Sequence, residues 1–165
     1  MNTQGQVEET PEAQLSAWIL PISSSEVVAV GQYELKHIES VSSLVSLPGL
    51  PAFCEQGFVW RDRFIPALDL WSLVTRKRPV SAKEGLAAII AYESTEGELA
   101  MGAILLSGVP KLLPVSASQS VAITELASHW QMLVQAAFKT DANVFPVLDL
   151  GRLFGKTPAD LLSLH

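Results

Sequence analysis

The chain has 165 residues, of which 48% are hydrophobic and 17% charged, and its formal net charge at pH 7 is −6. This length and composition suit one domain with a sizeable apolar core and exclude a chain that is disordered throughout. The acidic balance also argues against a nucleic-acid-binding protein, because neutralising phosphates requires clustered Lys and Arg, and only Arg76-Lys77-Arg78 forms a basic run.

Three features of the chain indicate the cellular compartment of the protein. The N-terminal segment is acidic where a secretory signal is basic and apolar. The richest apolar region, Leu99–Val115, is broken by Pro110 and by polar residues, whereas a membrane-spanning helix needs about 20 apolar residues. The lone Cys54 excludes an internal disulfide and is typical of a reducing compartment. We therefore expect a cytoplasmic protein without direct membrane insertion.

The N-terminal part predicts a tail followed by strands. Residues 1–16 are polar and acidic, so we expect a flexible tail ahead of one domain over residues 17–165. Apolar runs at 18–22 and 26–30 lie on either side of a Ser-rich turn, which predicts a hairpin. Residues 32–45 are expected to form another strand pair.

The next segment predicts a loop, a hairpin and a short helix. Leu47-Pro-Gly-Leu-Pro51 must be a loop, because each proline removes a donor and restricts the residue before it. Residues 57–60 and 64–68 are apolar runs joined by a polar turn, which again predicts a hairpin. We expect Asp69 to end that strand and to cap a short helix through Val74.

The second half predicts a similar series of strands. Residues 86–92 and 99–105 form a hairpin pattern, and residues 109–115, which contain two prolines, predict an edge strand. Residues 130–138 predict a strand with alternate residues on one face, followed after a turn by a strand over 144–148. The alternating positions are Met132, Val134, Ala136 and Phe138.

The C-terminus carries standard signals for the start of a helix. Thr157 is the expected cap, Pro158 the first helical residue and Asp160 an acidic residue of the first turn. A short C-terminal helix is therefore predicted.

A repeated segment connects the two halves. Phe64-Ile-Pro-Ala-Leu-Asp-Leu70 and Val144-Phe-Pro-Val-Leu-Asp-Leu150 align at an offset of 80 residues, and the same offset places Phe58 on Phe138. Strands this short suit small barrels, because closure hides the strand edges. We therefore expect a mostly β protein of two small barrels packed on each other.

The chain carries a series of motifs: Leu47-Pro-x-x-Pro51, then Phe53, a Gly-containing strand ending in Trp60-Arg61, and Phe64-Ile-Pro-x-Leu-Asp-Leu70. Taken together, they resemble the CheW-like domain family, the coupling proteins of bacterial chemosensory arrays. The family pattern, Ile-Pro-x-x-Pro-x-Phe-x-x-Gly followed by strands ending Asn-Leu-Arg-Gly and Pro-x-x-Asp-Leu, is matched without a gap from Pro51 to Leu70 and more weakly from Trp18 to Phe154. The sequence departs from it at Val59-Trp-Arg-Asp62, at Gln56 in place of glycine, and at His37 in place of an acidic residue. With these departures, the chain is most similar to the family members that accompany type IV pilus chemosensory systems.

The resemblance implies a fold and a function. The fold is mostly β, with two small five-stranded SH3-like barrels sharing a core. The function is that of a non-catalytic adaptor for chemotaxis or twitching motility, which couples the cytoplasmic tip of a methyl-accepting chemoreceptor to the regulatory domain of a CheA-type histidine kinase. No cofactor is implied.

The resemblance also implies a protein-binding surface. The receptor groove of the family surrounds the residues aligned with Leu35, Ile38 and Arg61, and His37 lies on the same strand. Arg61 is the strongest candidate, because a guanidinium offers several fixed donors and its stem can pack on Trp60 or Phe58. The rim of the surface is expected at Gln56, Gly57 and Asp62.

Enzyme hypotheses find little support in the residues. Gly151–Thr157 is one residue short of a phosphate-binding loop, and too few residues follow it for a nucleotide-binding fold. Asp69 and Asp149 are explained by helix capping. The three histidines, His37, His129 and His165, lack metal-ligand spacing. We expect no catalytic or metal site; the alternative is a small-molecule-binding or hydrolytic β-barrel protein that uses the cleft between its halves.

Overall fold

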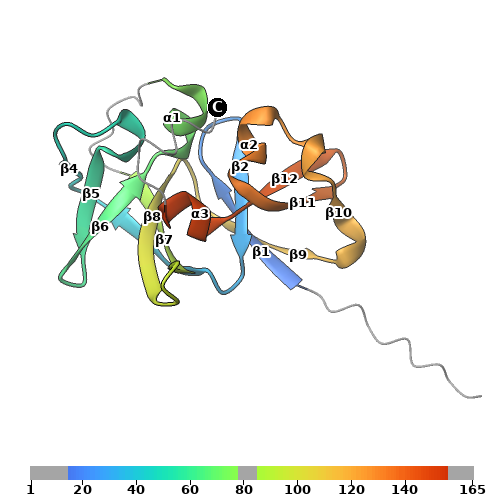
Figure 1. The fold of residues 1–165 in the computed structure, drawn as a ribbon, viewed down its shortest axis with the longest axis horizontal. Helices are drawn as coiled ribbons and strands as arrows, with labels where there is room; N and C mark the ends of the chain where they lie inside the picture. The colour runs from blue at the N-terminus through green and yellow to red at the C-terminus, as the bar shows by residue number, and fades with distance from the viewer. Residues whose placement is uncertain (1–14, 78–84, 156–165) are drawn as a thin grey trace, which may run out of the picture.

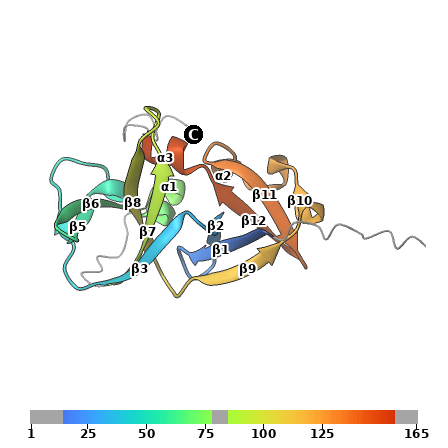
Figure 2. The same ribbon diagram turned by 90° about the horizontal axis from the view of Figure 1, so that it is seen from below.

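The fold consists of two curled six-stranded sheets that pack side by side (Figures 1 and 2). The structure is a computed structural model and describes residues 15–77 and 85–155. The first sheet follows the order β3-β7-β8-β6-β5-β4, and we call it barrel 1; the second follows the order β9-β1-β2-β12-β11-β10, and we call it barrel 2. The mostly β, two-barrel prediction is confirmed.

Barrel 1 is built from the middle of the chain. Its strands are β3 (Leu35–Val41), β4 (Val45–Ser46), β5 (Gln56–Trp60), β6 (Arg63–Leu68), β7 (Gly85–Glu93) and β8 (Leu99–Leu106). Its short helices are η1 (Ala52–Cys54) and α1 (Leu70–Thr75).

Barrel 2 combines the two ends of the described chain. Its strands are β1 (Leu15–Pro21), β2 (Val27–Gly31), β9 (Lys111–Val115), β10 (Ser120–Val121), β11 (Val134–Thr140) and β12 (Asn143–Leu148). Its helices are η2 (Ala117–Gln119), η3 (Ile123–Glu125), α2 (Ser128–Gln131) and α3 (Leu150–Gly155). Each barrel thus has five longer strands, as expected, and one additional strand of two residues.

The two barrels exchange a hairpin, which the sequence did not reveal. The β1–β2 hairpin joins barrel 2, where β2 pairs with β12 in parallel, and the β7–β8 hairpin joins barrel 1, where β8 pairs with β6 in parallel. The strand orders of the two sheets correspond position by position. The sequence repeat therefore corresponds to two equivalent barrels. Each barrel takes four strands from one repeat and a hairpin from the other, so neither barrel coincides with one half of the chain.

Most predicted hairpins are present. Antiparallel pairs join β1 to β2, β5 to β6, β7 to β8 and β11 to β12, and β9 is an edge strand of its sheet. Turn residues and alternating apolar residues are local signals, so these pairs could be found from the sequence.

Two strand predictions are wrong. Residues 32–45 hold one long strand, β3, which pairs with the distant β7 instead of a neighbour within that range. Residues 130–138 begin in helix α2, which contains Trp130, and strand β11 starts only at Val134. An irregularity between Val134 and Ala136 shifts the alternation, so Ala136 is exposed; Met132, which follows α2 and precedes β11, is exposed as well. The predicted C-terminal helix at Thr157 lies outside the described residues.

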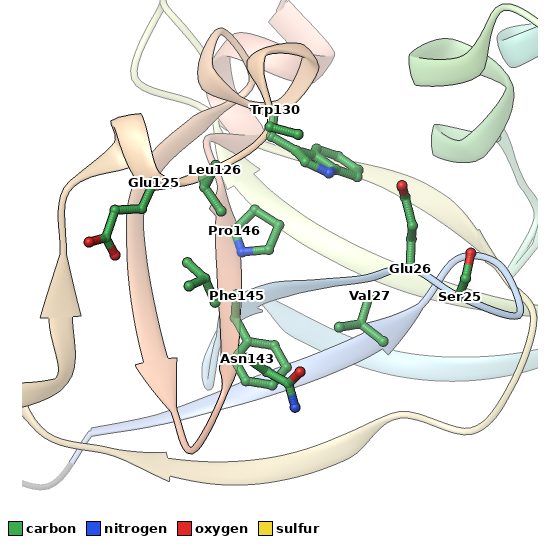
Figure 3. A pocket seen from close by; sticks show the side chains of 11 residues that line it. Ser25, Glu26, Val27, Glu125, Leu126, Trp130, Asn143, Phe145 and Pro146 are labelled. Carbon is green, nitrogen blue, oxygen red and sulfur yellow. The ribbon is translucent and has the colours of Figure 1, made fainter.

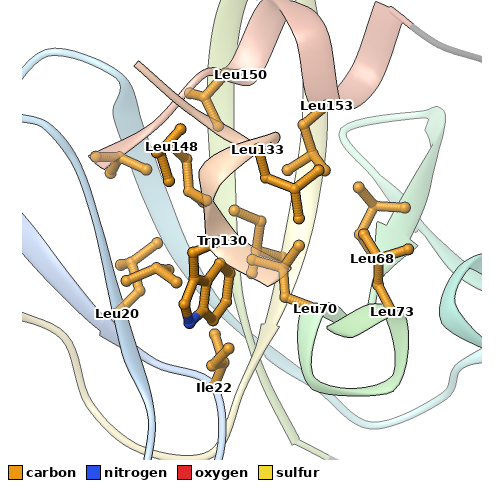
Figure 4. Close-up of a cluster of buried hydrophobic side chains, with 14 of the residues drawn as sticks. Leu20, Ile22, Leu68, Leu70, Leu73, Trp130, Leu133, Leu148, Leu150 and Leu153 are labelled. Atoms are coloured by element: carbon orange, nitrogen blue, oxygen red, sulfur yellow. The ribbon is translucent and has the colours of Figure 1, made fainter. Parts of the chain in front are cut away.

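Three clusters of buried side chains form the core. The largest lies between the barrels and gathers residues from both, as Figure 4 shows for Leu20, Leu70, Leu150 and Trp130. A second cluster, which includes Phe58 and Ile65, fills the inside of barrel 1. A third, which includes Ile19 and Phe138, fills barrel 2, with the partly buried Phe145 packed against it. The junction between the barrels is thus packed with apolar side chains, which gives no support to a ligand cleft there.

Candidate protein-binding surface

The hairpin turn between β5 and β6 presents Arg61. Arg61 and Asp62 both have positive φ, 48° and 62°, as a tight two-residue turn requires. The Cζ atom of Arg61 lies 4.3 Å from the centroid of the Trp60 ring, so the cation packs on the aromatic face. Both turn residues are exposed. It is thus the guanidinium of Arg61 that packs on Trp60, where the sequence predicted a contact of its stem with Trp60 or Phe58.

Strand β3 approaches the same tryptophan from another part of the sheet. The ring centroids of His37 and Trp60 are 5.8 Å apart, although β3 and β5 are not neighbours in the sheet order. His37 Nε2 also lies 2.8 Å from Glu39 Oε2. The curl of the sheet thus brings His37, Trp60 and Arg61 together. We call these three residues the Trp60 cluster.

The other predicted residues of β3 lie beside this cluster. Leu35 and Ile38 are half-buried, and Leu35 packs against the core between the barrels. Trp60 and Glu39 were not among the predicted site residues. Glu39 could have been found, because it lies two positions from His37 on the same strand and so on the same face.

Gln56 and Gly57 lie away from Arg61, at the opposite end of β5. Gly57 is buried beneath the Phe64 ring: a Cβ atom there would overlap Phe64 Cζ and lie 2.8 Å from the carbonyl oxygen of Ile65. Glycine is needed here for this close approach. The structure therefore separates the predicted rim residues into two groups, with only Asp62 next to Arg61.

An exposed apolar face covers the outside of β4, β5 and β6. The strand register places Val45 and Pro66 opposite Gly57, and Phe64 opposite Val59, so all five share one side of the sheet. Val45, Val59 and Phe64 are 48%, 68% and 46% exposed. The other side of these strands, with Phe58 and Ile65, faces the inside of barrel 1. We call this set the outer apolar face; of its five residues, Gly57 alone was a predicted site residue.

The structure was searched for catalytic and metal-binding arrangements of the residues that the sequence offered for them. The carboxylates of Asp69 and Asp149 each accept a hydrogen bond from the first turn of the following helix, at 3.0 Å. Burial, together with the nearby Glu55 charge, raises the pKa of the Cys54 thiol. Within residues 15–77 and 85–155, His, Cys, Asp and Glu side chains form no group of three that could hold a metal ion. Lys156 and Thr157 of the loop-like motif lie outside the described residues.

A search of the same residues for membrane spans finds no helix with the length and hydrophobicity to cross a bilayer. The described helices are short, the longest, α1 and α3, having six residues each.

Comparisons with known proteins agree with this architecture. The structure is similar to a crystal structure of the scaffolding protein TtCheW from Thermoanaerobacter tengcongensis, with a TM-score of 0.69 and 18% sequence identity over 87% of this chain and 96% of that chain. Curated protein sequences give no significant match. The family model of the CheW-like domain matches residues 22–158, which is most of the chain. The chain therefore belongs to the CheW-like domain family.

Proposed function

We propose that this protein is a non-catalytic adaptor that couples a chemoreceptor to a CheA-type histidine kinase on the cytoplasmic side of a receptor array. The observation that carries the proposal is the Trp60 cluster, which lies on a CheW-like fold at the positions that the family resemblance implies for receptor contact. The predicted boundary between an acidic tail over residues 1–16 and a domain over residues 17–165 is two residues too late, because Leu15 and Ser16 already belong to strand β1 and pair with β9.

The receptor surface that we propose contains the Trp60 cluster with Leu35, Ile38 and Asp62. Arg61 supplies an exposed guanidinium held against an aromatic ring, and the half-buried Leu35 and Ile38 supply apolar area beside it. A surface of this kind suits a helical receptor tip with acidic and apolar side chains on one face. Asp62, beside Arg61, disfavours a partner that brings a carboxylate to that end of the turn.

The kinase surface that we propose is the outer apolar face, which includes Gly57, together with the neighbouring Gln56. Three exposed apolar side chains on adjacent strands form a continuous patch, which is typical of a protein contact. This patch lies on the outside of the barrel, whereas His37 and Arg61 pack on Trp60, which belongs with the barrel's inner face. The two surfaces would allow an adaptor to hold both partners at once.

The departures at His37, Gln56 and Asp62 place the protein, in our proposal, among the variants that accompany type IV pilus chemosensory systems and twitching motility. A flagellar output is the other possible output for the same adaptor. Deletion of the coding sequence, followed by parallel assays of swimming and twitching, distinguishes the two.

Binding measurements with single variants test the adaptor proposal. The wild-type protein should bind both the receptor tip and the kinase regulatory domain in isothermal titration calorimetry. Arg61→Ala should weaken receptor binding about tenfold and leave kinase binding unchanged, and Val59→Asp should do the reverse. Arg63→Ala, an exposed arginine of the same hairpin, is the matched control. If the wild-type protein binds neither partner, the adaptor function is wrong; if Arg61→Ala binds the receptor normally, the proposed receptor surface is wrong.

A further inference from the structure

The chain consists of two structural repeats that complete each other. Repeat 1 runs from β1 to α1 and repeat 2 from β7 to α3, with equivalent strands in the same order. The β1–β2 hairpin of repeat 1 lies between β9 and β12 of repeat 2, and the β7–β8 hairpin of repeat 2 lies between β3 and β6 of repeat 1. Each repeat therefore has a gap in its sheet that a hairpin of the other repeat fills.

Neither repeat forms a continuous sheet from its own strands. Among the described strands, β3 pairs with β7 alone, and β9 pairs with β1 alone. A repeat without its partner would leave this strand without a neighbour and would expose the backbone groups on both sides of the gap. Unpaired strand edges favour pairing with another strand, so the complementary hairpin is the natural occupant of the gap.

The core clusters inside the barrels also depend on both repeats. Inside barrel 1, Phe58 and Ile65 of repeat 1 cluster with Ile89 of repeat 2. Inside barrel 2, Ile19 of repeat 1 clusters with Phe138 of repeat 2. The cluster between the barrels is likewise drawn from both repeats. Separation of the repeats would therefore expose each of these clusters to water.

The boundary between the repeats reaches the surface of barrel 2 (Figure 3). Val27 of β2 and Phe145 and Pro146 of β12 line one pocket there, with a volume of about 480 Å³. Behind it, β2 and β12 run parallel, with Ala29 paired with Val147. The repeats thus meet here through strand pairing and side-chain packing between segments that are far apart in the chain.

One covalent connection joins the repeats, the chain segment over residues 76–84 between α1 and β7. The strand pairings and core contacts between the repeats require the two repeats to lie side by side, but they do not require both to belong to the same chain. Two copies can therefore exchange repeats without loss of strand pairing or of buried apolar area. Exchange of identical elements is a low-cost route to a dimer.

We propose that a second copy of this chain can supply the partner of each repeat, which gives an exchanged dimer. Repeat 1 of one copy and repeat 2 of the other build one complete two-barrel unit, and the remaining two repeats build a second. A short connection holds two modules at an effective concentration of the order of millimolar. The monomer is therefore the main form at micromolar concentration, and the dimer becomes comparable when the chains fold at about 1 mM.

The exchanged dimer has two copies of both proposed partner surfaces. His37, Trp60 and Arg61 belong to repeat 1, as do strands β4, β5 and β6 of the outer apolar face, so each two-barrel unit contains one complete set. This consequence rests on the proposed function, whereas the exchange itself depends on the pairing and packing of the repeats.

A disulfide between the repeats detects the exchange. Ser40 of β3 and Leu86 of β7 are paired in register and belong to different repeats. One full-length chain carries Ser40→Cys, and a second, with a mass tag, carries Leu86→Cys; both carry Cys54→Ala, which removes the one native thiol. The two chains are unfolded together in urea, refolded under reducing conditions at about 10 µM or about 1 mM, and then oxidised.

The mixture should give a disulfide-linked heterodimer, because an exchanged unit places the two cysteines side by side. Light scattering should find about 2% of the chains in dimers after refolding at about 10 µM and about half after refolding at about 1 mM, as a millimolar effective concentration requires. Chains that are folded separately and then mixed should give none, because exchange requires the barrels to open. The matched control is Ser40→Cys with Glu96→Cys, which places the second cysteine in the exposed turn at the far end of β7.

Two results overturn the proposal. One is the absence of a dimer after refolding at about 1 mM. The other is cross-linking of the Ser40 and Leu86 variants that is no stronger than that of the Ser40 and Glu96 control, because the dimer would then be a contact between intact monomers. If the half-buried Leu86→Cys does not fold, Leu15→Cys and Val115→Cys, a register pair of β1 and β9, take its place with the same criterion. Neither result affects the adaptor proposal, which is tested by partner binding.

Discussion

Asp69 and Asp149, which are 80 residues apart, make the same hydrogen bonds in the two barrels. Each Oδ1 atom accepts from the backbone N–H three residues later, at 3.0 Å, and each backbone N–H donates to a carbonyl of the segment before β5 or β11, that of Phe53 or Leu133. Phe53 and Leu133 are themselves 80 residues apart. The repeated Asp is thus the junction at which strand, helix and preceding segment meet in each barrel.

Removal of either capping carboxylate should therefore destabilise the fold without affecting partner binding. Asp69→Ala and Asp149→Ala should each lower the free energy of unfolding by about 1 kcal/mol, the usual value for the loss of an N-cap side chain. Urea denaturation measures the effect, and Glu96→Ala, an exposed turn carboxylate, is the control. A folded Asp69→Ala protein that had lost all partner binding would contradict a purely structural role.

Gly57 should tolerate no side chain. Gly57→Ala places a methyl group against the Phe64 ring and the Ile65 carbonyl, and the backbone contact cannot be relieved by a rotamer change, so the unfolding free energy should fall by about 1–3 kcal/mol. Gly85→Ala is the matched control, because a Cβ atom there meets nothing within 4 Å. Chemical denaturation of the pair gives the comparison, and equal stabilities would mean that Phe64 does not lie across Gly57.

Trp130 should be among the most costly core residues to truncate. It is 5% exposed and packs in the cluster between the barrels, so Trp130→Ala should cost about 3–5 kcal/mol. Tyr33→Ala, at a position that is 81% exposed, should change the stability by less than about 0.5 kcal/mol. Thermal and urea unfolding of both variants provide the measurement. A small loss for Trp130→Ala would show that α2 is not part of the core.

The stability of the fold should decline in alkaline solution. Burial raises the pKa of the Cys54 thiol and that of the Tyr92 phenol, so the folded state holds these protons more tightly than the unfolded state does. As the pH rises through the unfolded pKa values, from about 8.5 for Cys and about 10 for Tyr, the unfolded chain loses its protons first and the free energy of unfolding falls.

Variants separate the two contributions to this decline. Cys54→Ala should remove the part that begins near pH 8.5, and Tyr92→Phe the part that begins near pH 10. Urea unfolding between pH 7 and pH 11 gives the profiles. A wild-type stability that stayed level or rose over this range would contradict the predicted sign.

Local signals account for what could be predicted from the sequence. The hairpins and both helix caps depend on residues close together in the chain, such as Asp69 and Ser72, and these were found. The exchange of hairpins depends on pairing between distant strands, β2 with β12 and β6 with β8, for which the chain carries no local signal.

The errors have equally specific causes. The apolar run from Trp130 to Phe138 has the period of a strand, yet its first part forms one helical turn that buries Trp130, and an irregularity in β11 breaks the alternation. At the candidate site, the family pattern predicted Arg61, and the structure shows its contact with Trp60. His37 lies next to Trp60 only because the sheet curls, which no spacing along the chain encodes.

The exchanged hairpins also determine how the molecule responds to force and to cleavage. Barrel 1 is one continuous segment, β3 to β8, whereas barrel 2 combines β1 and β2 with β9 to β12, so a fragment that ends between β8 and β9 leaves barrel 2 with only its β1–β2 hairpin. The barrels should therefore unfold in a single transition and behave as one rigid body under load. An adaptor built in this way would hold its two partners at a fixed angle, so that a displacement of one is transmitted to the other without loss at a hinge.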